Sequence, residues 1–233
     1  NANYILVSAD YSQIELRIIA ALSGDPNMIA AFKSGHDIHA ATAAKVFHTP
    51  IDEVSREQRS AAKAVNFGII YGQSAFGLAQ NLQISRTEAK GIIDAYFEQY
   101  GTIKTYMDKA VKDARENGYV ETIMQRRRYL PDINSANAVV RGFAERNAIN
   151  SPIQGTAADM IKLAMIKIDQ KLKDLNLKTK MLLQVHDELL FEAPVGEVET
   201  AKTLIKTEME SAFETKVPLL VEVGVGDNWL QAH

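Results

Sequence analysis

Apolar and polar residues follow two different periods along this chain, and the change of period separates strand-forming from helix-forming segments. Residues 33–118 carry the signals of a mostly helical segment. Short apolar runs of strand length lie outside it, at residues 4–10, 181–185, 189–191 and 219–225. The pattern predicts an α+β fold, in which the helical segment is inserted between two parts of one antiparallel-sheet domain.

Single residues place several helix boundaries. Ser55 with Gln58, and Ser85 with Glu88, have capping-box spacing, in which each side chain satisfies a backbone donor of the other residue. Gly118 is the residue type that most readily ends a helix in a left-handed conformation. We expect helices at residues 13–22, 55–70, 85–100, 103–118, 138–147, 156–175 and 197–214, and hairpins at 119–130 and 181–191, the second with residues 186–188 at its tip.

Composition narrows the class of protein. The chain has 233 residues and 46% hydrophobic content, enough to bury a core. No apolar run approaches the ~20 residues of a membrane helix, and residues 1–4 lack the layout of a signal peptide, so no membrane partner is expected. Cysteine is absent. Any metal would therefore be held by carboxylates, carbonyls or histidine, which favours hard cations.

The charge of the chain leaves two interpretations open. The formal net charge of −3 argues against binding nucleic acid through overall basicity, because phosphates are neutralised by Lys and Arg. Basic residues nevertheless cluster, at Arg56, Arg59, Lys63, Arg126, Arg127, Arg128, Arg141 and Arg146. These clusters fit either a local nucleic-acid surface or an ordinary solvated charge pattern.

Two aspartates form the best candidate pair of metal ligands. Asp10 stands where the first predicted strand ends, and Asp187 stands at the tip of the second hairpin. Antiparallel neighbours could bring both carboxylates to one edge of a sheet. Mg²⁺ prefers one or two carboxylates together with water and substrate phosphates, so such a pair suits a nucleotide site. The alternative is that both aspartates cap turns or face water.

One predicted helix carries a stripe of cations and aromatic rings. Arg59, Lys63, Phe67 and Tyr71 follow one another in steps of four residues and so share one face. The cations could bond a triphosphate, and the rings could stack on a base or sugar. The alternative places both rings in the core and both cations in solvent. Gly68 disfavours this alternative, because a glycine inside a helix costs about 1 kcal/mol relative to alanine and indicates a close approach to the backbone.

Three separated stretches resemble the three polymerase motifs of the DNA polymerase I family, and they occur in the same order. The stretches are Asp10-Tyr11-Ser12-Gln13-Ile14-Glu15-Leu16-Arg17, then Arg59, Lys63, Phe67-Gly68 and Tyr71-Gly72 at motif spacing, then Val185-His186-Asp187-Glu188. Residues 37–39, 126–131 and 146–157 also look like family segments. The resemblance covers essentially the whole chain and is far more specific than any one motif.

The resemblance implies a palm subdomain at residues 1–32 and 129–233, with mostly helical fingers at residues 33–128. It also implies template-directed addition of deoxynucleotides to a primer 3′-hydroxyl by a two-Mg²⁺ mechanism that releases pyrophosphate. The implied metal ligands are Asp10, Asp187 and the backbone carbonyl of Tyr11. The implied nucleotide-binding residues are Gln13, Glu15, His39, Arg59, Lys63, Phe67 and Tyr71. The implied DNA-binding residues are Arg146, Asn150, Gln154, His186 and Glu188.

Some of these implied roles have alternatives. Lys63 would be catalytic as a general acid toward the pyrophosphate, or would be a plain phosphate clamp. Met124-Gln125 and Ala40 depart from the family pattern, which leaves template contacts by residues 126–128 open. The thumb, the upstream palm and any exonuclease domains would precede residue 1, so we expect a fragment.

Two rival functions remain. A single-subunit RNA polymerase is disfavoured by Glu15 and Phe67. A nucleic-acid-binding module without activity is disfavoured by the presence of Asp10, Lys63 and Asp187. The expected partners are primer–template DNA and deoxynucleoside triphosphates, and the protein is expected to act as a monomer in the bacterial cytoplasm, at the nucleoid.

Overall fold

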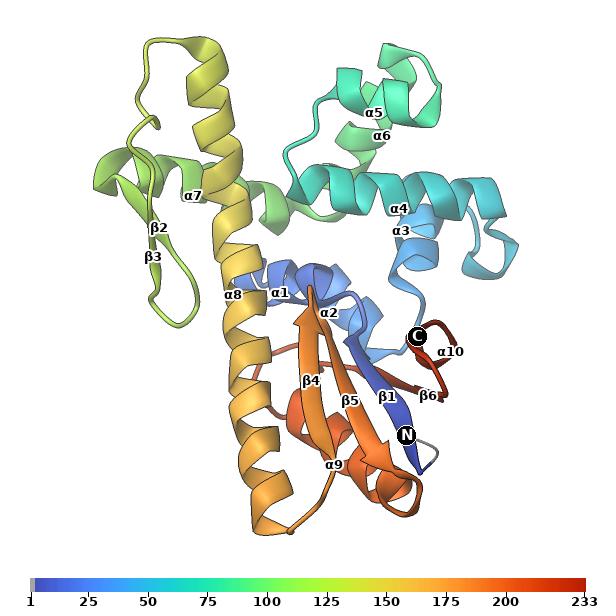
Figure 1. Ribbon diagram of the computed structural model, residues 1–233. Helices are drawn as coiled ribbons and strands as arrows, with labels where there is room; N and C mark the ends of the chain where they lie inside the picture. Colours follow the sequence, from blue (N-terminus) through green and yellow to red (C-terminus); the bar gives the residue numbers. More distant parts are fainter. Residues whose placement is uncertain (1–2) are drawn as a thin grey trace. The chain divides into compact units, whose positions relative to one another are not determined.

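The computed structural model describes residues 3–233 and confirms the predicted α+β fold with an antiparallel sheet (Figure 1). The chain divides into two compact units. The first, which we call the sheet unit, comprises Asn1–Ile14 and Ala157–His233. The second, the helical unit, comprises Glu15–Thr156.

Four antiparallel strands in the order β4-β5-β1-β6 form the sheet unit. They are β1 (Tyr4–Tyr11), β4 (Lys180–Val185), β5 (Glu188–Pro194) and β6 (Val221–Gly226). The two central strands, β1 and β5, bury side chains such as Val7, Ala9 and Phe191 completely. Because such strands are covered on both faces, they read as continuous apolar runs in the sequence.

Two helices pack on this sheet. After a short 3-10 turn (η2, Val195–Glu197), α9 (Val198–Glu210) contacts β1, β5 and β6. The short helix α10 (Trp229–Ala232) contacts β1 and β6. The helix expected at 197–214 is therefore real but ends earlier.

The helical unit begins with seven helices and one 3-10 turn. They are α1 (Ile14–Ser23, whose first residue belongs to the sheet unit), α2 (Pro26–Lys33), α3 (Ile38–Val46), η1 (Ile51–Glu53), α4 (Arg56–Ile70), α5 (Ala75–Leu82), α6 (Arg86–Gln99) and α7 (Gly101–Asn117). Both predicted capping boxes form, at Ser55 with Gln58 and at Ser85 with Glu88. Gly118 ends α7 with a φ of 80°, as predicted.

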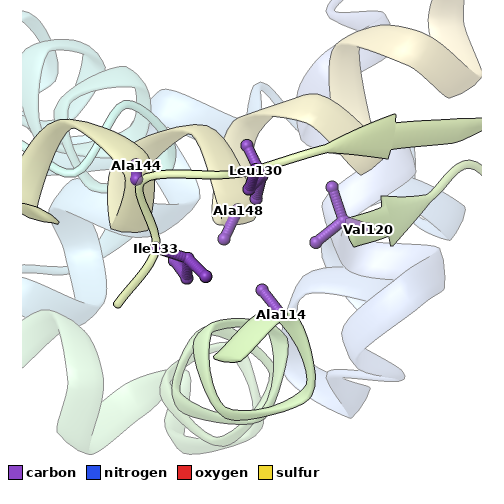
Figure 2. Packing of buried hydrophobic residues seen from close by; sticks show 6 residues of the cluster. All are labelled: Ala114, Val120, Leu130, Ile133, Ala144 and Ala148. Atoms are coloured by element: carbon purple, nitrogen blue, oxygen red, sulfur yellow. The ribbon is translucent and has the colours of Figure 1, made fainter. Parts of the chain in front are cut away.

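A small hairpin follows α7 and is held by its own apolar cluster. The hairpin consists of β2 (Tyr119–Glu121) and β3 (Arg127–Tyr129). Figure 2 shows the cluster, whose members come from α7, β2, the segment after β3 and the first part of α8 (Ala138–Asp174): Ala114, Val120, Leu130, Ile133, Ala144 and Ala148. The packing fixes the hairpin against both helices.

The prediction of two helices at 138–147 and 156–175 was wrong, because α8 is one continuous helix with Pro152 inside it. Proline has no N–H and crowds the preceding turn, which normally ends a helix. Here the Ser151 hydroxyl bonds the Asn147 carbonyl at 2.5 Å, and Ile149 and Ile153 are buried. The burial of these side chains outweighs the cost of the missing N–H and the crowded turn at Pro152. None of the helices within residues 3–233 is long and apolar enough to cross a membrane.

Candidate functional site

Asp10 and Asp187 lie at the same edge of the sheet. Asp10 is the penultimate residue of β1 and pairs in register with Glu188, the first residue of β5. Asp187 stands in the turn between β4 and β5, and its backbone carbonyl accepts a hydrogen bond from the Tyr11 N–H at 3.3 Å. The predicted meeting of the two aspartates at one edge is confirmed. Their chemical role stays a prediction.

The electrostatics of this edge fit a cation. The pKa of Asp10 is raised to about 6, first by burial and then by repulsion from Asp187, Glu188 and Glu222, while His233 acts in the opposite direction. Carboxylates crowded in this way resist ionisation unless a positive charge balances them. The oxygen donors are those that Mg²⁺ prefers.

This donor set is small. Among residues 3–233, no group of three or more His, Asp or Glu side chains could hold a metal ion by itself. Two carboxylates fit a Mg²⁺ site that takes its other ligands from water and substrate phosphates, and they do not fit a closed structural cage.

Glu188 is held in place beside this pair. Its side chain is 8% exposed. Its Oε1 accepts hydrogen bonds from the Ser8 hydroxyl at 2.6 Å and from the Trp229 indole N–H at 2.7 Å, and His233 Nδ1 lies 3.6 Å from Oε2. Sequence reasoning missed Ser8 and Trp229. Ser8 could have been found, because it stands two residues before Asp10 on the same face of the strand. Nothing in the sequence pattern points to Trp229.

The backbone after Asp10 is anchored on both sides. The Tyr11 side chain is buried, and its hydroxyl donates to the Met209 carbonyl of α9 at 2.7 Å. Burial raises the pKa of this phenol. Gln13, which links β1 to α1, has a φ of 55°. The segment that carries the implied carbonyl ligand is therefore fixed by its own side chain.

In the helical unit, α4 presents part of the predicted stripe to a cavity of about 780 Å³. Lys63, Phe67 and Tyr71 line this cavity together with Arg146. Lys63 is exposed, and Phe67 is half-buried. Tyr71 is the C-cap of α4 and is 41% exposed. The alternative that Tyr71 belongs to the core is therefore wrong.

Gly68 has the close neighbour that its position predicted. A Cβ placed on Gly68 would collide with the side chain of Gln73, which folds back against α4 and also lines the cavity. Gly72 has a φ of 67°, and a Cβ there would lie 2.8 Å from Cγ of Arg146. Gly72 is thus required by its left-handed backbone, whereas at Gly68 the close neighbour is the end of the flexible Gln73 side chain.

Arg59 does not line that cavity but forms an ion pair. Its Nη2 lies 2.6 Å from Oδ2 of Asp37, and its Nε donates to the same oxygen at 2.8 Å. The other oxygen of Asp37 caps α3 by accepting from the N–H groups of His39 and Ala40. These bonds hold the pKa of Asp37 below its usual value, against the effect of its partial burial. Arg59 is thus tied to the start of α3.

His39, at the start of α3, is almost completely buried. Its Nδ1 lies 3.0 Å from Nδ2 of Asn66, a residue of α4 that sequence reasoning missed. The pKa of His39 is lowered to about 4, mainly by burial and also by the nearby Arg59 and Lys63 cations, while Asp37 opposes this shift. His39 is therefore neutral at pH 7.

Glu15 and Tyr71 are in direct contact. The Tyr71 hydroxyl donates to Oε2 of Glu15 at 2.7 Å. Glu15 lies in the first turn of α1, where its charge also suits the helix dipole. The structure therefore brings together two residues that the sequence predicted separately.

Three predicted DNA-binding residues lie on α8 at steps of four, so they share one face: Arg146, Asn150 and Gln154. The guanidinium of Arg146 lies 5.9 Å from the ring centre of Phe143. Oδ1 of Asn150 is buried without a hydrogen-bond partner within residues 3–233. Gln154 is exposed beside the β2–β3 hairpin, where it lines a pocket of about 160 Å³ with Arg126, Arg127 and Arg128.

His186 belongs instead to the sheet unit. It is exposed in the β4–β5 turn with a φ of 55°. The predicted site residues are thus divided between the units, with Asp10, Tyr11, Gln13, His186, Asp187 and Glu188 in the sheet unit and the others in the helical unit.

Comparisons with known proteins are consistent with this arrangement. A family model described as DNA polymerase family A matches residues 1–231. DNA polymerase I of Caldicellulosiruptor bescii is 57% identical over 228 residues, which cover 98% of this chain and 27% of that protein. DNA polymerase I of Lactococcus lactis subsp. lactis is 53% identical over 229 residues, covering 98% of this chain and 26% of that protein. The chain thus spans about a quarter of the length of these relatives.

A solved structure is similar over the whole chain. It is the POL domain of Pol1 from M. smegmatis, described as a complex with DNA primer–template and dNTP. The TM-score is 0.96 at 49% sequence identity, covering 100% of this chain and 41% of that one.

Proposed function

The chain belongs to DNA polymerase family A, and on that premise we propose that it carries out template-directed addition of deoxynucleotides to a primer 3′-hydroxyl, with release of pyrophosphate. The observation that carries the proposal is the shared sheet edge of Asp10 and Asp187. The family match supplies the reaction, and the edge supplies a place for its chemistry.

We propose that Asp10, Asp187 and the backbone carbonyl of Tyr11 hold two Mg²⁺ ions. The raised pKa of Asp10 supports this assignment, because it reflects burial first and then repulsion from neighbouring carboxylates, and a bound cation would offset both. When bound, two such ions activate the primer hydroxyl and offset the charge that develops on the leaving group. The chain itself contributes the fixed positions of the carboxylates.

The incoming nucleotide is assigned to α4 and its neighbours. Lys63 is an exposed cation on a cavity wall, suited to a triphosphate. It would act there as a general acid or as a charge clamp, and the two roles predict different pH profiles. Arg59 would bind a phosphate after its ion pair with Asp37 breaks. Neutral His39 would serve as a hydrogen-bond donor rather than as a cation.

The sugar and base of the nucleotide are assigned to the remaining predicted residues of that group. Glu15 and Tyr71 would act as one hydrogen-bonded pair, since the Tyr71 hydroxyl already bonds the Glu15 carboxylate. Phe67 would lie against the nucleotide, and its half-buried position leaves part of the ring accessible for stacking. Gln13 is kept in this group by the resemblance alone.

Template and primer are assigned to the α8 face of Arg146, Asn150 and Gln154, together with His186. The side-chain carbonyl oxygen of Asn150 has no hydrogen-bond partner in the described part of the chain, and a nucleic-acid donor would satisfy it. Glu188 was predicted to contact DNA as well, and this role stays a prediction for a side chain that is buried and already bonded.

For the architecture, we propose a palm at residues 1–32 and 129–233 and fingers at residues 33–128. The compact units divide the chain at different points, after residues 14 and 156, so the proposed palm includes part of the helical unit. We further propose a monomer that acts on DNA in the cytoplasm of a bacterium. The bacterial relatives support the bacterial source, and the monomeric state stays a prediction.

A primer-extension assay tests the proposed function. The 233-residue chain would be compared with a full-length relative on a labelled primer–template with Mg²⁺ and the four deoxynucleotides. Extension that requires the template, and that Asp10→Asn abolishes, is the expected result. Duplex binding without extension by this chain would favour a binding module, and preference for ribonucleotides would favour an RNA polymerase.

A further inference from the structure

Glu188 is a buried acid whose side chain is oriented by two neutral donors from different elements. Ser8 comes from β1 and Trp229 from α10, and both donate to the same oxygen, at 2.6 and 2.7 Å. Neutral donors orient a carboxylate without cancelling its charge. An indole N–H can only donate, so this contact requires an acceptor such as Glu188.

The position of Trp229 does not follow from core packing alone. Trp229 is 40% exposed, yet its indole N–H donates to the carboxylate of Glu188, a residue that is 6% exposed. A tryptophan that served only to fill the core would be more deeply buried, as Phe191 is in β5. The hydrogen bond from Trp229 to Glu188 is therefore the contact through which Trp229 would act on the carboxylates of the sheet edge.

The helix α10 packs closely against β6. Asn228 caps the helix by accepting from the Gln231 N–H at 3.1 Å. On β6, a Cβ added to Gly226 would lie 2.6 Å from the Ala232 nitrogen, which is too close for any other residue type. A glycine in the strand thus lets α10 approach, and the approach fixes where the indole can lie.

We propose that Trp229 and Ser8 are positioning residues, which hold the Glu188 carboxylate as a fixed third negative charge beside the metal-binding pair Asp10 and Asp187. The inference rests on the metal-binding role proposed above and extends the site to α10. It assigns Glu188 no direct bond to a metal. The negative charge of Glu188 makes the electrostatic potential at the sheet edge more negative. The two hydrogen bonds keep the carboxylate from rotating toward solvent.

The first test measures metal binding without catalysis. Mn²⁺ would be titrated into the 233-residue chain and free Mn²⁺ followed by electron paramagnetic resonance. Trp229→Phe keeps a ring and removes the N–H, and Ser8→Ala removes the other donor. Each should weaken Mn²⁺ binding, by up to about tenfold, with a nearly unchanged melting temperature. Glu188→Gln, which keeps an acceptor but removes the charge, should do the same.

The matched control is Leu230→Ala, since Leu230 lies on the same helix and is 89% exposed. It should bind Mn²⁺ like the parent. Parent-like binding by both Trp229→Phe and Ser8→Ala would overturn the inference while leaving the metal site in place. Absence of any binding that depends on Asp10 would overturn the proposed metal site, and the inference with it.

A second readout uses the side chain itself, because Trp229 is the single tryptophan of the chain. Mn²⁺ is a paramagnetic quencher, so it should reduce the fluorescence of Trp229 with the same midpoint as in the resonance titration. Asp10→Asn should abolish the quenching. Bound Mn²⁺ that leaves the emission unchanged would show that Trp229 does not neighbour the site, and would overturn the inference even if Trp229→Phe fails to fold.

Discussion

The Tyr71 hydroxyl donates a hydrogen bond to the Glu15 carboxylate at 2.7 Å, and so joins the end of α4 to the first turn of α1. Both residues were predicted to contact the incoming nucleotide. Their bond favours one position of each side chain relative to the other. Glu15 and Tyr71 together would therefore form the part of the proposed nucleotide site that contacts the sugar.

A double-mutant cycle tests this coupling. Glu15→Ala removes the group that would exclude a ribose 2′-hydroxyl, and Tyr71→Phe removes only the bond that holds it. Each should admit ribonucleotides more readily, and the double variant should gain little more than Glu15→Ala alone. Folding stability should fall by about 1 kcal/mol or less for Tyr71→Phe, because the bond is partly exposed. Additive effects on the ratio of ribo- to deoxynucleotide incorporation would contradict the coupling.

Phe67 offers a second test of sugar recognition. Its ring has no hydroxyl, so it cannot replace the hydrogen bond lost when an incoming sugar lacks its 3′-hydroxyl. Phe67→Tyr should relax discrimination against dideoxynucleotides, by up to a few kcal/mol. The measurement is the ratio of dideoxy to deoxy incorporation efficiency, made in a full-length relative if this chain is inactive. An unchanged ratio with a lower melting temperature would mean that Phe67 only fills space.

His39 predicts a pH dependence of stability. Its pKa is about 4 in the folded chain and 6.5 ordinarily, so the unfolded chain takes up a proton first as the pH falls. The contribution of neutral His39 to the free energy of unfolding is therefore fully present above pH 6.5 and is lost as the pH falls toward 4. The difference corresponds to at most about 3 kcal/mol. Urea unfolding between pH 7 and pH 4 should show a shallower loss for His39→Gln than for the parent, and parallel curves would refute the assignment.

The carboxylate edge predicts opposite effects on activity and stability. Asp10→Asn and Asp187→Asn should each abolish incorporation, because each removes charge from the proposed metals. Asp10→Asn should also raise the melting temperature of the metal-free chain at pH 8, since it removes the two causes of the raised pKa of Asp10, which are the burial of a charge and its repulsion by neighbouring carboxylates. Retained incorporation by both variants would exclude the metal assignment. Unfolding of either variant would mean that the carboxylate is structural.

Local signals in the sequence were enough for several features. Capping boxes located α4 and α6, and Gly118 located the end of α7, because each depends on bonds within a few residues. Two apolar runs predicted the strands β1 and β5, and their observed antiparallel pairing brings Asp10 to the same edge as Asp187.

Features that depend on distant contacts were not predictable. Pro152 predicts a break that tertiary packing of α8 removes, and the bond from Trp229 to Glu188 joins residues whose contact no periodicity encodes. The bond from Asn66 to His39 is likewise hidden, because an asparagine inside a helix most often faces solvent.

DNA binding by this chain should be weak and steeply salt-dependent, since the proposed contacts are largely cations to phosphates. Arg146, on the proposed DNA face of α8, is the sharpest probe. Arg146→Ala should reduce the slope of log affinity against log salt by about 1, as loss of one phosphate contact does. Gln154 lies eight residues further along the same face, about two helical turns away. Gln154→Ala should weaken binding at every salt concentration and leave the slope unchanged, because glutamine carries no charge. The matched control is Lys104→Ala, which removes one exposed cation from α7 that already pairs with Asp108 at 2.8 Å.

The measurement is a titration of labelled primer–template at several salt concentrations. Equal slope changes for Arg146→Ala and Lys104→Ala would mean that the slope reports net charge alone and that α8 has no special contact with the phosphates.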